Sequence, residues 1–203
     1  EREEPVLLKR LKDAGYTVWW GGKNDLIPGN QSLEPYCDVK YTPPAGERVE
    51  PMWQIQREQE WRGPAGGDRY YSFFVGELPH TPGAEHYHDG DWANIQGALE
   101  LIRGYKGDKP LCIYLPLTYP HPPYAVEEPW FSQIERAVLP PRPAAPPDWR
   151  GKPSILPRLD ELQGMGGWDE ARWAELRAVY YGMCARLDFQ FGLLMEALKE
   201  SGM

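Results

Sequence analysis

One stretch in the middle of the chain, residues 109–124, constrains the fold more than any other. Leu111 to Leu117 is a short apolar run with β-branched and aromatic members. This pattern predicts a buried strand, and it favours a parallel sheet because parallel strands are usually apolar on both faces. The residues that follow, Tyr119 to Tyr124, include three prolines, which cannot donate to a strand ladder. We therefore expect His121 in a stiff loop just past the C-terminal end of a central strand, the edge at which open α/β sheets bind ligands.

A second strand and turn are predicted near the start of the chain. Residues 5–14 have the apolar spacing of a helix, and residues 16–20 are typical of a strand. Gly21-Gly22-Lys23-Asn24-Asp25 follows this strand directly. Because two glycines let the backbone turn sharply, Lys23 is expected close to whatever binds at the C-terminal end of the strand.

Four further elements complete the expected fold. They are a strand over 70–75, a short helix over 52–61, a helix over 91–104 with Asp91 as its N-cap, and a long amphipathic helix over 170–200. The order helix, strand, loop occurs twice, which favours an α/β sheet with crossover helices.

Two long segments interrupt this pattern. Residues 26–69 are predicted to be a loop-rich insertion over the sheet edge, since loops of this length are usually functional or disordered. Residues 140–167 are predicted to be a proline-rich surface excursion, because residues 140–157 contain seven prolines and no periodicity.

Length and charge narrow the classes of function. A chain of 203 residues can form one domain with a real core. Its net charge of −8 argues against a nucleic-acid-binding surface. The sequence has no run of about 18 apolar residues, so we expect no membrane span. The three cysteines are far apart and odd in number, which fits neither a disulfide framework nor a zinc site.

Lys23 and His121 are the first candidates for chemistry. Either one alone is more often a solvated or structural residue. Each, however, follows a predicted parallel strand at the same sheet edge, and together they would form a site for a tetrahedral anion. The lysine would neutralise non-bridging oxygens of a sulfate or phosphate ester, and the histidine would bind an oxygen or protonate the leaving alkoxide.

A second cluster lies between residues 86 and 91. His86, His88, Asp89 and Asp91 could hold a metal ion, but an exposed loop that ends in a helix N-cap is the favoured interpretation. His80 also lies near prolines, but it precedes a helix instead of following the strongest strand.

Several motifs occur in an order that resembles the type I sulfatases of the alkaline phosphatase superfamily. They are Leu-Lys-Asp-Ala-Gly-Tyr-Thr at 11–17, Gly-Lys at 22–23, Ile-Tyr-Leu at 113–115, Pro-His-Pro-Pro-Tyr at 120–124, Tyr-Tyr-Gly-Met at 180–183, Arg-Leu-Asp at 186–188 and Leu-Met-Glu-Ala-Leu at 194–198. The resemblance covers both ends and the middle of the chain, and it is weak over 26–68 and 140–167.

The resemblance implies a fold and a chemistry. The fold would be a three-layer α/β/α sheet like that of alkaline phosphatase, incomplete in this chain. The family uses a calcium ion and a formylglycine made from cysteine or serine. By motif, Lys23 and His121 would be the catalytic contacts to the sulfate ester, and Lys23, Asn24, Asp25 and His121 would bind substrate. The family commonly has histidine where Asp25 stands here, and an acidic group more reasonably binds substrate hydroxyls, orders the loop or acts as an acid.

Two features of the family are missing from these residues. The nucleophile motif Cys/Ser-x-Pro-x-Arg does not occur, and neither do the expected pairs of metal-binding aspartates. We therefore expect residues 1–203 to be a partial sulfatase catalytic domain, an internal segment that is inactive alone and lacks both the calcium ligands and the formylglycine. The parent protein would have both.

Two other functions stay open on the sequence. One is a phosphate or phosphonate ester hydrolase on the same scaffold. The other is a non-catalytic carbohydrate-binding protein, which would explain the missing nucleophile and the many tryptophans. A saccharide sulfate is a reasonable substrate if loop tryptophans stack on sugar rings, although each is more often a loop anchor; the tryptophans in question are Trp53, Trp61, Trp130 and Trp149.

Overall fold

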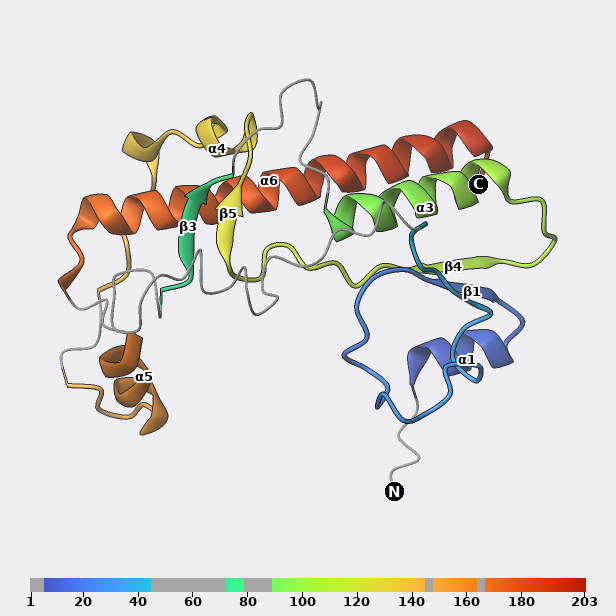
Figure 1. The fold of residues 1–203 in the computed structure, drawn as a ribbon, viewed down its shortest axis with the longest axis horizontal. Helices are drawn as coiled ribbons and strands as arrows, with labels where there is room; N and C mark the ends of the chain where they lie inside the picture. The colour runs from blue at the N-terminus through green and yellow to red at the C-terminus, as the bar shows by residue number, and fades with distance from the viewer. Residues whose placement is uncertain (1–5, 45–71, 79–88, 145–147, 164–166) are drawn as a thin grey trace. The chain divides into compact units, whose positions relative to one another are not determined.

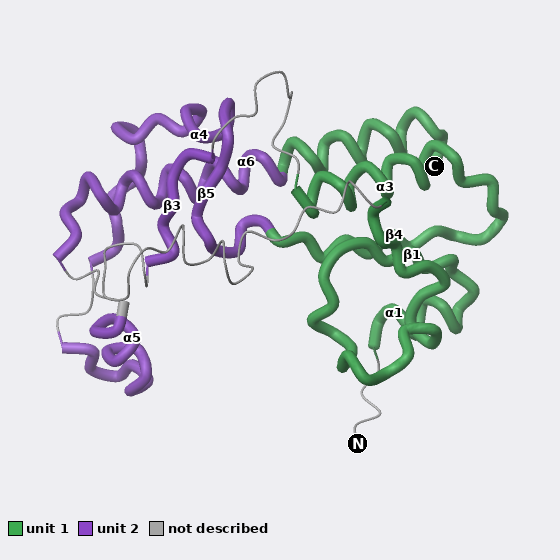
Figure 2. The backbone as a smooth tube through the Cα atoms, viewed as in Figure 1, with its two compact units in different colours: residues 1–50, 88–118, 188–203 green, residues 51–87, 119–187 purple. Residues whose placement is uncertain are grey.

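The chain forms two compact units in a computed structural model that describes residues 6–44, 72–78, 89–144, 148–163 and 167–203. Unit 1 comprises residues 1–50, 88–118 and 188–203, and unit 2 comprises residues 51–87 and 119–187 (Figure 2). The prediction that residues 1–203 are part of one catalytic domain stays a prediction.

Unit 1 is built on a three-stranded parallel sheet. Its central strand is β1 (Thr17–Trp20), with β2 (Val39–Lys40) on one side and β4 (Leu111–Tyr114) on the other. Trp19 of β1 pairs with Val39 of β2 and Ile113 of β4. The predictions of a mixed α/β fold and of parallel strands are confirmed.

Helices cover both faces of this sheet. Alternate residues of β1 and β4 pack with α1 (Leu7–Asp13) in one core cluster, which includes Leu8, Val18 and Trp20. On the opposite face, Ile113 packs with α3 (Gly90–Gly104) and with the C-terminal part of α6 (Glu170–Ser201). Figure 1 shows these three layers of unit 1, with the strands between α1 and the α3–α6 pair.

Strand β4 is shorter and less buried than the sequence predicts. It ends at Tyr114 instead of Leu117, and each of its four residues is only half-buried. The strand stops because its partner β1 ends at Trp20 and because Pro116 has no N–H to continue the ladder. Leu115 and Leu117 still contribute to the core beneath α3.

The N-cap of helix α3 lies two residues earlier than predicted, so the cap is a different aspartate. Asp89 is the N-cap, and its carboxylate accepts a hydrogen bond from the backbone N–H of Trp92 at 3.0 Å. The prediction of Asp91 as the cap was wrong, because Asp91 lies inside the first turn and bonds elsewhere. His80, His86 and His88 lie outside the described residues.

Unit 2 has a two-stranded parallel sheet that packs on the first half of α6. Strand β3 (Phe74–Glu77) pairs with β5 (Tyr124–Val126), and Phe74, Val126 and Met183 share one core cluster. Short helices follow at α4 (Trp130–Gln133) and at a 3₁₀ turn over Arg136–Val138.

Two predictions for unit 2 need correction. Of the strand predicted over 70–75, residues 70 and 71 lie outside the described residues, and β3 begins at Phe74, since Phe73 has a positive φ of 55° that breaks the extended backbone. The excursion over 140–167 contains a helix, α5 (Ile155–Gln163), that the prolines hid. Pro157 is tolerated because it lies in the first turn, where backbone N–H groups have no helical partner.

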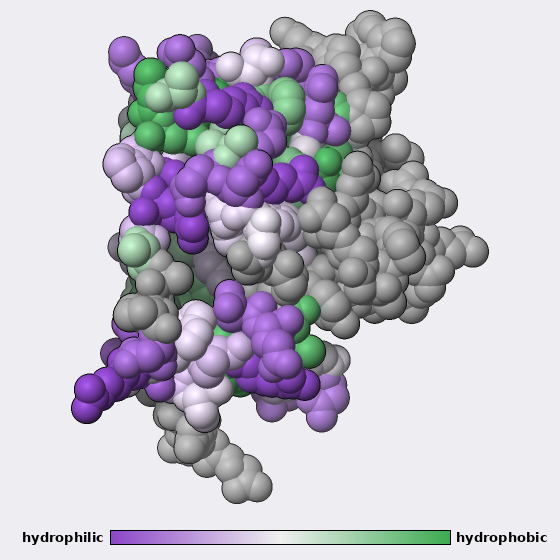
Figure 3. Space-filling model, turned by 90° about the vertical axis from the view of Figure 1, so that its left-hand side faces the viewer, coloured by the Kyte–Doolittle hydropathy of each residue, from purple (hydrophilic) through white to green (hydrophobic). Residues whose placement is uncertain are grey.

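Helix α6 confirms the long helix predicted over 170–200. The helix predicted over 52–61 lies outside the described residues, as does most of the 26–69 segment. In the described part of the chain, no helix is long and apolar enough to span a bilayer. Hydrophilic and hydrophobic residues are interspersed on the face of the molecule that Figure 3 shows.

Candidate functional site

The candidate site is the edge of the unit 1 sheet where β1, β2 and β4 end side by side. The turn after β1 is tied to the segment after β4 by two backbone hydrogen bonds. Gly21 N donates to Tyr114 O and Lys23 N donates to Pro116 O, both at 3.0 Å. The turn after β1 and residues 114–116 therefore meet at one edge of the unit 1 sheet.

The backbone of the Gly22-Lys23 turn is held on its other side by two side chains. The indole Nε1 of Trp20 donates to the carbonyl of Lys23 at 2.8 Å. The ammonium of Lys40 donates to the carbonyl of Gly22 at 2.6 Å and lies 5.4 Å from the centre of the Trp20 ring. Burial lowers the pKa of Lys40. Sequence reasoning missed Lys40, although its place at the end of a strand parallel to β1 brings it to the same edge.

The side chain of Lys23 reaches the surface but does not stand alone. It is 34% exposed, and its Nζ lies 2.9 Å from a carboxylate oxygen of Asp25, which is 76% exposed. At this edge the positive charge of Lys23 is therefore balanced by the solvent-exposed carboxylate of Asp25. Such a pair is weak, so an incoming anion can compete with Asp25 for the lysine.

The amide of Asn24 is engaged within its own loop. Its Oδ1 accepts from the N–H groups of Leu26 at 3.2 Å and Ile27 at 2.9 Å, and its Nδ2 donates to the carbonyl of Ile27 at 2.9 Å. These bonds close an Asx-type turn after Lys23. The substrate-binding roles of Asn24 and Asp25 stay predictions.

The first turns of α3 lie over the same edge. Asp91 is 5% exposed, and both of its oxygens accept from the N–H of Thr118, at 2.8 and 3.0 Å. Asn94 faces the turn after β1, since a Cβ built on Gly21 would lie 3.1 Å from its Oδ1. Asp91 therefore positions the segment after β4, a role that the sequence does not reveal because the contact is long-range.

Gly22 offers a test of how tightly this turn is built. Its φ is +96°, and a Cβ at this position would lie 2.6 Å from the carbonyl oxygen of Pro116. We expect Gly22→Ala to lower the free energy of unfolding by about 2–3 kcal/mol through backbone strain and this clash. Chemical denaturation would measure it. The control is Gly29→Ala, where a Cβ meets nothing within 4 Å; equal losses in the two variants would contradict the account.

His121 belongs to unit 2 and lies exposed in the loop between Tyr119 and β5. Its Nδ1 is 2.6 Å from the carbonyl oxygen of Pro122. Because a carbonyl can only accept, Nδ1 is the donor in this contact, and Nε2 is the ring nitrogen left to contact a ligand. The convergence of His121 with Lys23 stays a prediction.

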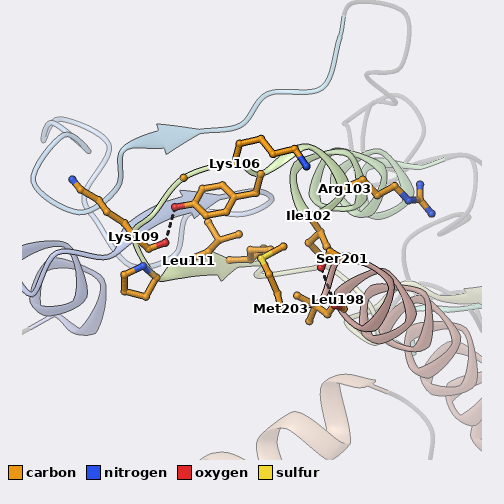
Figure 4. Close-up of a pocket in the computed structure, with 12 residues that line it drawn as sticks. Ile102, Arg103, Lys106, Lys109, Leu111, Leu198, Ser201 and Met203 are labelled. Atoms are coloured by element: carbon orange, nitrogen blue, oxygen red, sulfur yellow. Dashed lines mark hydrogen bonds between the residues drawn. The ribbon is translucent and has the colours of Figure 1, made fainter.

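A pocket at the opposite end of the unit 1 sheet has a volume of about 620 Å³. Its lining includes Arg103, Lys106 and Lys109 together with apolar residues such as Leu111 and Leu198. Figure 4 shows the charged ends of Arg103 and Lys109 pointing away from one another. Arg103 and Lys109 therefore do not converge on one point in this pocket.

The calcium ion and the formylglycine that the resemblance implies stay expectations for the parent protein. Among the described residues, no group of three or more His, Cys, Asp or Glu side chains could hold a metal ion. Burial raises the pKa of the thiols of Cys37, Cys112 and Cys184, so none is activated as a thiolate.

The tryptophans give limited support for sugar stacking. Trp130 is 8% exposed and packs in the core of unit 2, so it anchors α4 and cannot stack on a sugar. Trp149 is half-buried, and Trp53 and Trp61 lie outside the described residues.

Comparison with known proteins adds no family to this description. A scan against protein-family models gives no match for this chain, and a search of curated proteins gives none either. The resemblance to sulfatases therefore rests on the motifs of the chain itself.

Proposed function

We propose that the protein to which these residues belong is a sulfuric ester hydrolase, with a saccharide sulfate as a reasonable substrate. The observation that carries the proposal is the Lys23 turn. A lysine is held at the C-terminal edge of a parallel, helix-covered sheet by hydrogen bonds to its own backbone and to the residue before it. The motif order supports the finer assignment to the alkaline-phosphatase-like fold.

Lys23 would act by binding the charge of the ester. Its ammonium neutralises a non-bridging oxygen of the sulfate, and the fixed turn means that little reorganisation is needed when negative charge develops in the transition state. In the proposal, Nε2 of His121 donates a proton to the leaving alkoxide. A formylglycine and a calcium ion are implied only for the parent protein, where they would supply a nucleophile and a Lewis acid.

A phosphate or phosphonate ester hydrolase remains the alternative, because a lysine binds any tetrahedral anion. Asp25 is the reason to retain this alternative. Its carboxylate lies 2.9 Å from the Lys23 ammonium, and it stands where sulfatases commonly have histidine. A carboxylate in place of a histidine makes the site more negative, which changes the charge of the ester that it binds best.

The test is to assay the full-length protein on 4-nitrophenyl sulfate, 4-nitrophenyl phosphate and a phenylphosphonate ester side by side. The proposal predicts the largest kcat/KM on the sulfate ester and no turnover by residues 1–203 alone. Preference for phosphorus esters would establish the alternative. Binding of sugars without cleavage of any ester would overturn both in favour of a carbohydrate-binding protein.

Asp25 gives a prediction specific to this chain. We expect Asp25→Asn to tighten binding of inorganic sulfate by about 2–5-fold, since it removes a surface charge pair of the usual small strength. Isothermal titration at low salt would measure this, and the gain should shrink as ionic strength rises. Asp13→Asn is the control, because Asp13 pairs with Lys9 at 2.7 Å in α1. Weaker sulfate binding by Asp25→Asn would show that Asp25 supports the anion site.

A further inference from the structure

We propose that Arg186 is a positioning residue that holds the loop carrying His121. The inference rests on the proposed function for its catalytic meaning, but its structural basis lies entirely within unit 2. Arg186 lies in α6 and is completely buried. A completely buried guanidinium needs a specific reason, because removing its charge from water is costly.

Arg186 contacts the residue at which the loop begins and the residue that follows β5, the strand to which the loop leads. Its Nε lies 3.0 Å from Oε1 of Glu127, which directly follows β5 and is also completely buried. Its guanidinium carbon lies 4.4 Å from the ring centre of Tyr119, the residue at which the loop begins. One side chain therefore joins Tyr119, at the start of the loop that carries His121, to Glu127, just past the strand that follows the loop.

Two further bonds close the loop on itself and on the sheet. The hydroxyl of Tyr119 donates to the carbonyl of Ala125 at 2.7 Å. The N–H of Tyr124 donates to the carbonyl of Phe73 at 2.7 Å, beside β3. With its ends held in this way, the loop has little freedom to change the direction in which His121 points.

Arginine suits this task better than lysine. Its planar guanidinium can stack on a ring and bind a carboxylate at the same time, whereas an ammonium is a point charge on a flexible stem. Arg186→Lys should therefore preserve the buried charge and loosen the loop. The matched control is Arg177→Lys on the same helix, whose guanidinium donates instead to the carbonyl of Pro140.

The test is a double-mutant cycle in the full-length protein with a sulfate ester as substrate. Arg186→Lys should lower kcat about 10–100-fold, the scale expected for a displaced catalytic group, while KM changes little. In a His121→Ala background, the same substitution should cost nothing further. An equal loss in both backgrounds would mean that Arg186 acts only on folding, and no loss in either would overturn the proposal.

A second readout does not depend on activity. Amide hydrogen exchange at residues 119–127 should be at least about tenfold faster in Arg186→Lys than in the wild type, and unchanged in Arg177→Lys. If the wild-type protein cleaves no ester, the proposed function fails and this readout alone decides the positioning role. Unchanged exchange in Arg186→Lys would overturn it. If Arg186→Lys does not fold, Tyr119→Leu removes the stacked ring, keeps the ion pair and is judged by the same readouts.

Discussion

Replacing Glu127 with alanine is expected to lower the free energy of unfolding by about 3–5 kcal/mol, which is a large part of the 5–15 kcal/mol of a typical domain. Glu127 and Arg186 are both completely buried, and their closest charged atoms are 3.0 Å apart. Removing the carboxylate takes away the negative charge that lies 3.0 Å from the buried guanidinium in the core of unit 2. Chemical denaturation of the protein, followed by circular dichroism, would measure the loss.

Two controls isolate the buried charge as the cause. Glu135→Ala changes an exposed carboxylate nearby and should alter stability by no more than about 0.5 kcal/mol. Replacing Glu127 and Arg186 together with methionine should recover much of the loss, because a buried pair is often no more stable than apolar residues of similar volume. If Glu127→Ala costs no more than Glu135→Ala, the pair does not stabilise unit 2.

Replacing Lys23 with alanine is expected to lower kcat/KM on a sulfate ester by about 10²–10³-fold, or roughly 3–4 kcal/mol of transition-state stabilisation. The loss follows from the removal of a cation on a turn that is fixed by Trp20, Lys40 and Pro116. Steady-state kinetics on the full-length protein would measure it. The fold should survive, because the Lys23 side chain is 34% exposed and the bonds that hold its turn are made by its backbone.

The control for Lys23 is Lys106→Ala. Lys106 is an exposed lysine in the same unit at the opposite end of the sheet, where the pocket of Figure 4 lies. We expect kcat/KM to change less than twofold, the range of an ordinary surface substitution. Equal kinetics for Lys23→Ala and the wild type would remove Lys23 from the site.

The elements that the sequence predicts well are those with continuous apolar patterns. The apolar pattern of the sequence predicts strands β1 and β4 and helix α6. The parallel pairing of β1 with β4 follows from apolar residues on both faces of each strand. The place of Lys23 at the sheet edge follows in turn, because it comes directly after a strand and two glycines.

The features that the sequence hides depend on partners far along the chain. Arg186 lies in an Arg-Leu-Asp motif that suggests a polar helix face, and only the packing of Glu127 and Tyr119 explains why it is buried. The sequence around Asp91 is typical of an N-cap, but in the structure its carboxylate accepts a hydrogen bond from the N–H of Thr118. Lys40 ends a strand too short for any pattern to identify. Local periodicity cannot report contacts of this kind.

The most direct test of the account is a crystal structure of the full-length protein with sulfate bound. The account predicts one sulfate within hydrogen-bonding distance of both the Lys23 ammonium and the His121 imidazole, with Asp25 displaced from the lysine. A sulfate held by neither side chain, or Lys23 and His121 on separate surfaces of the folded protein, would contradict it.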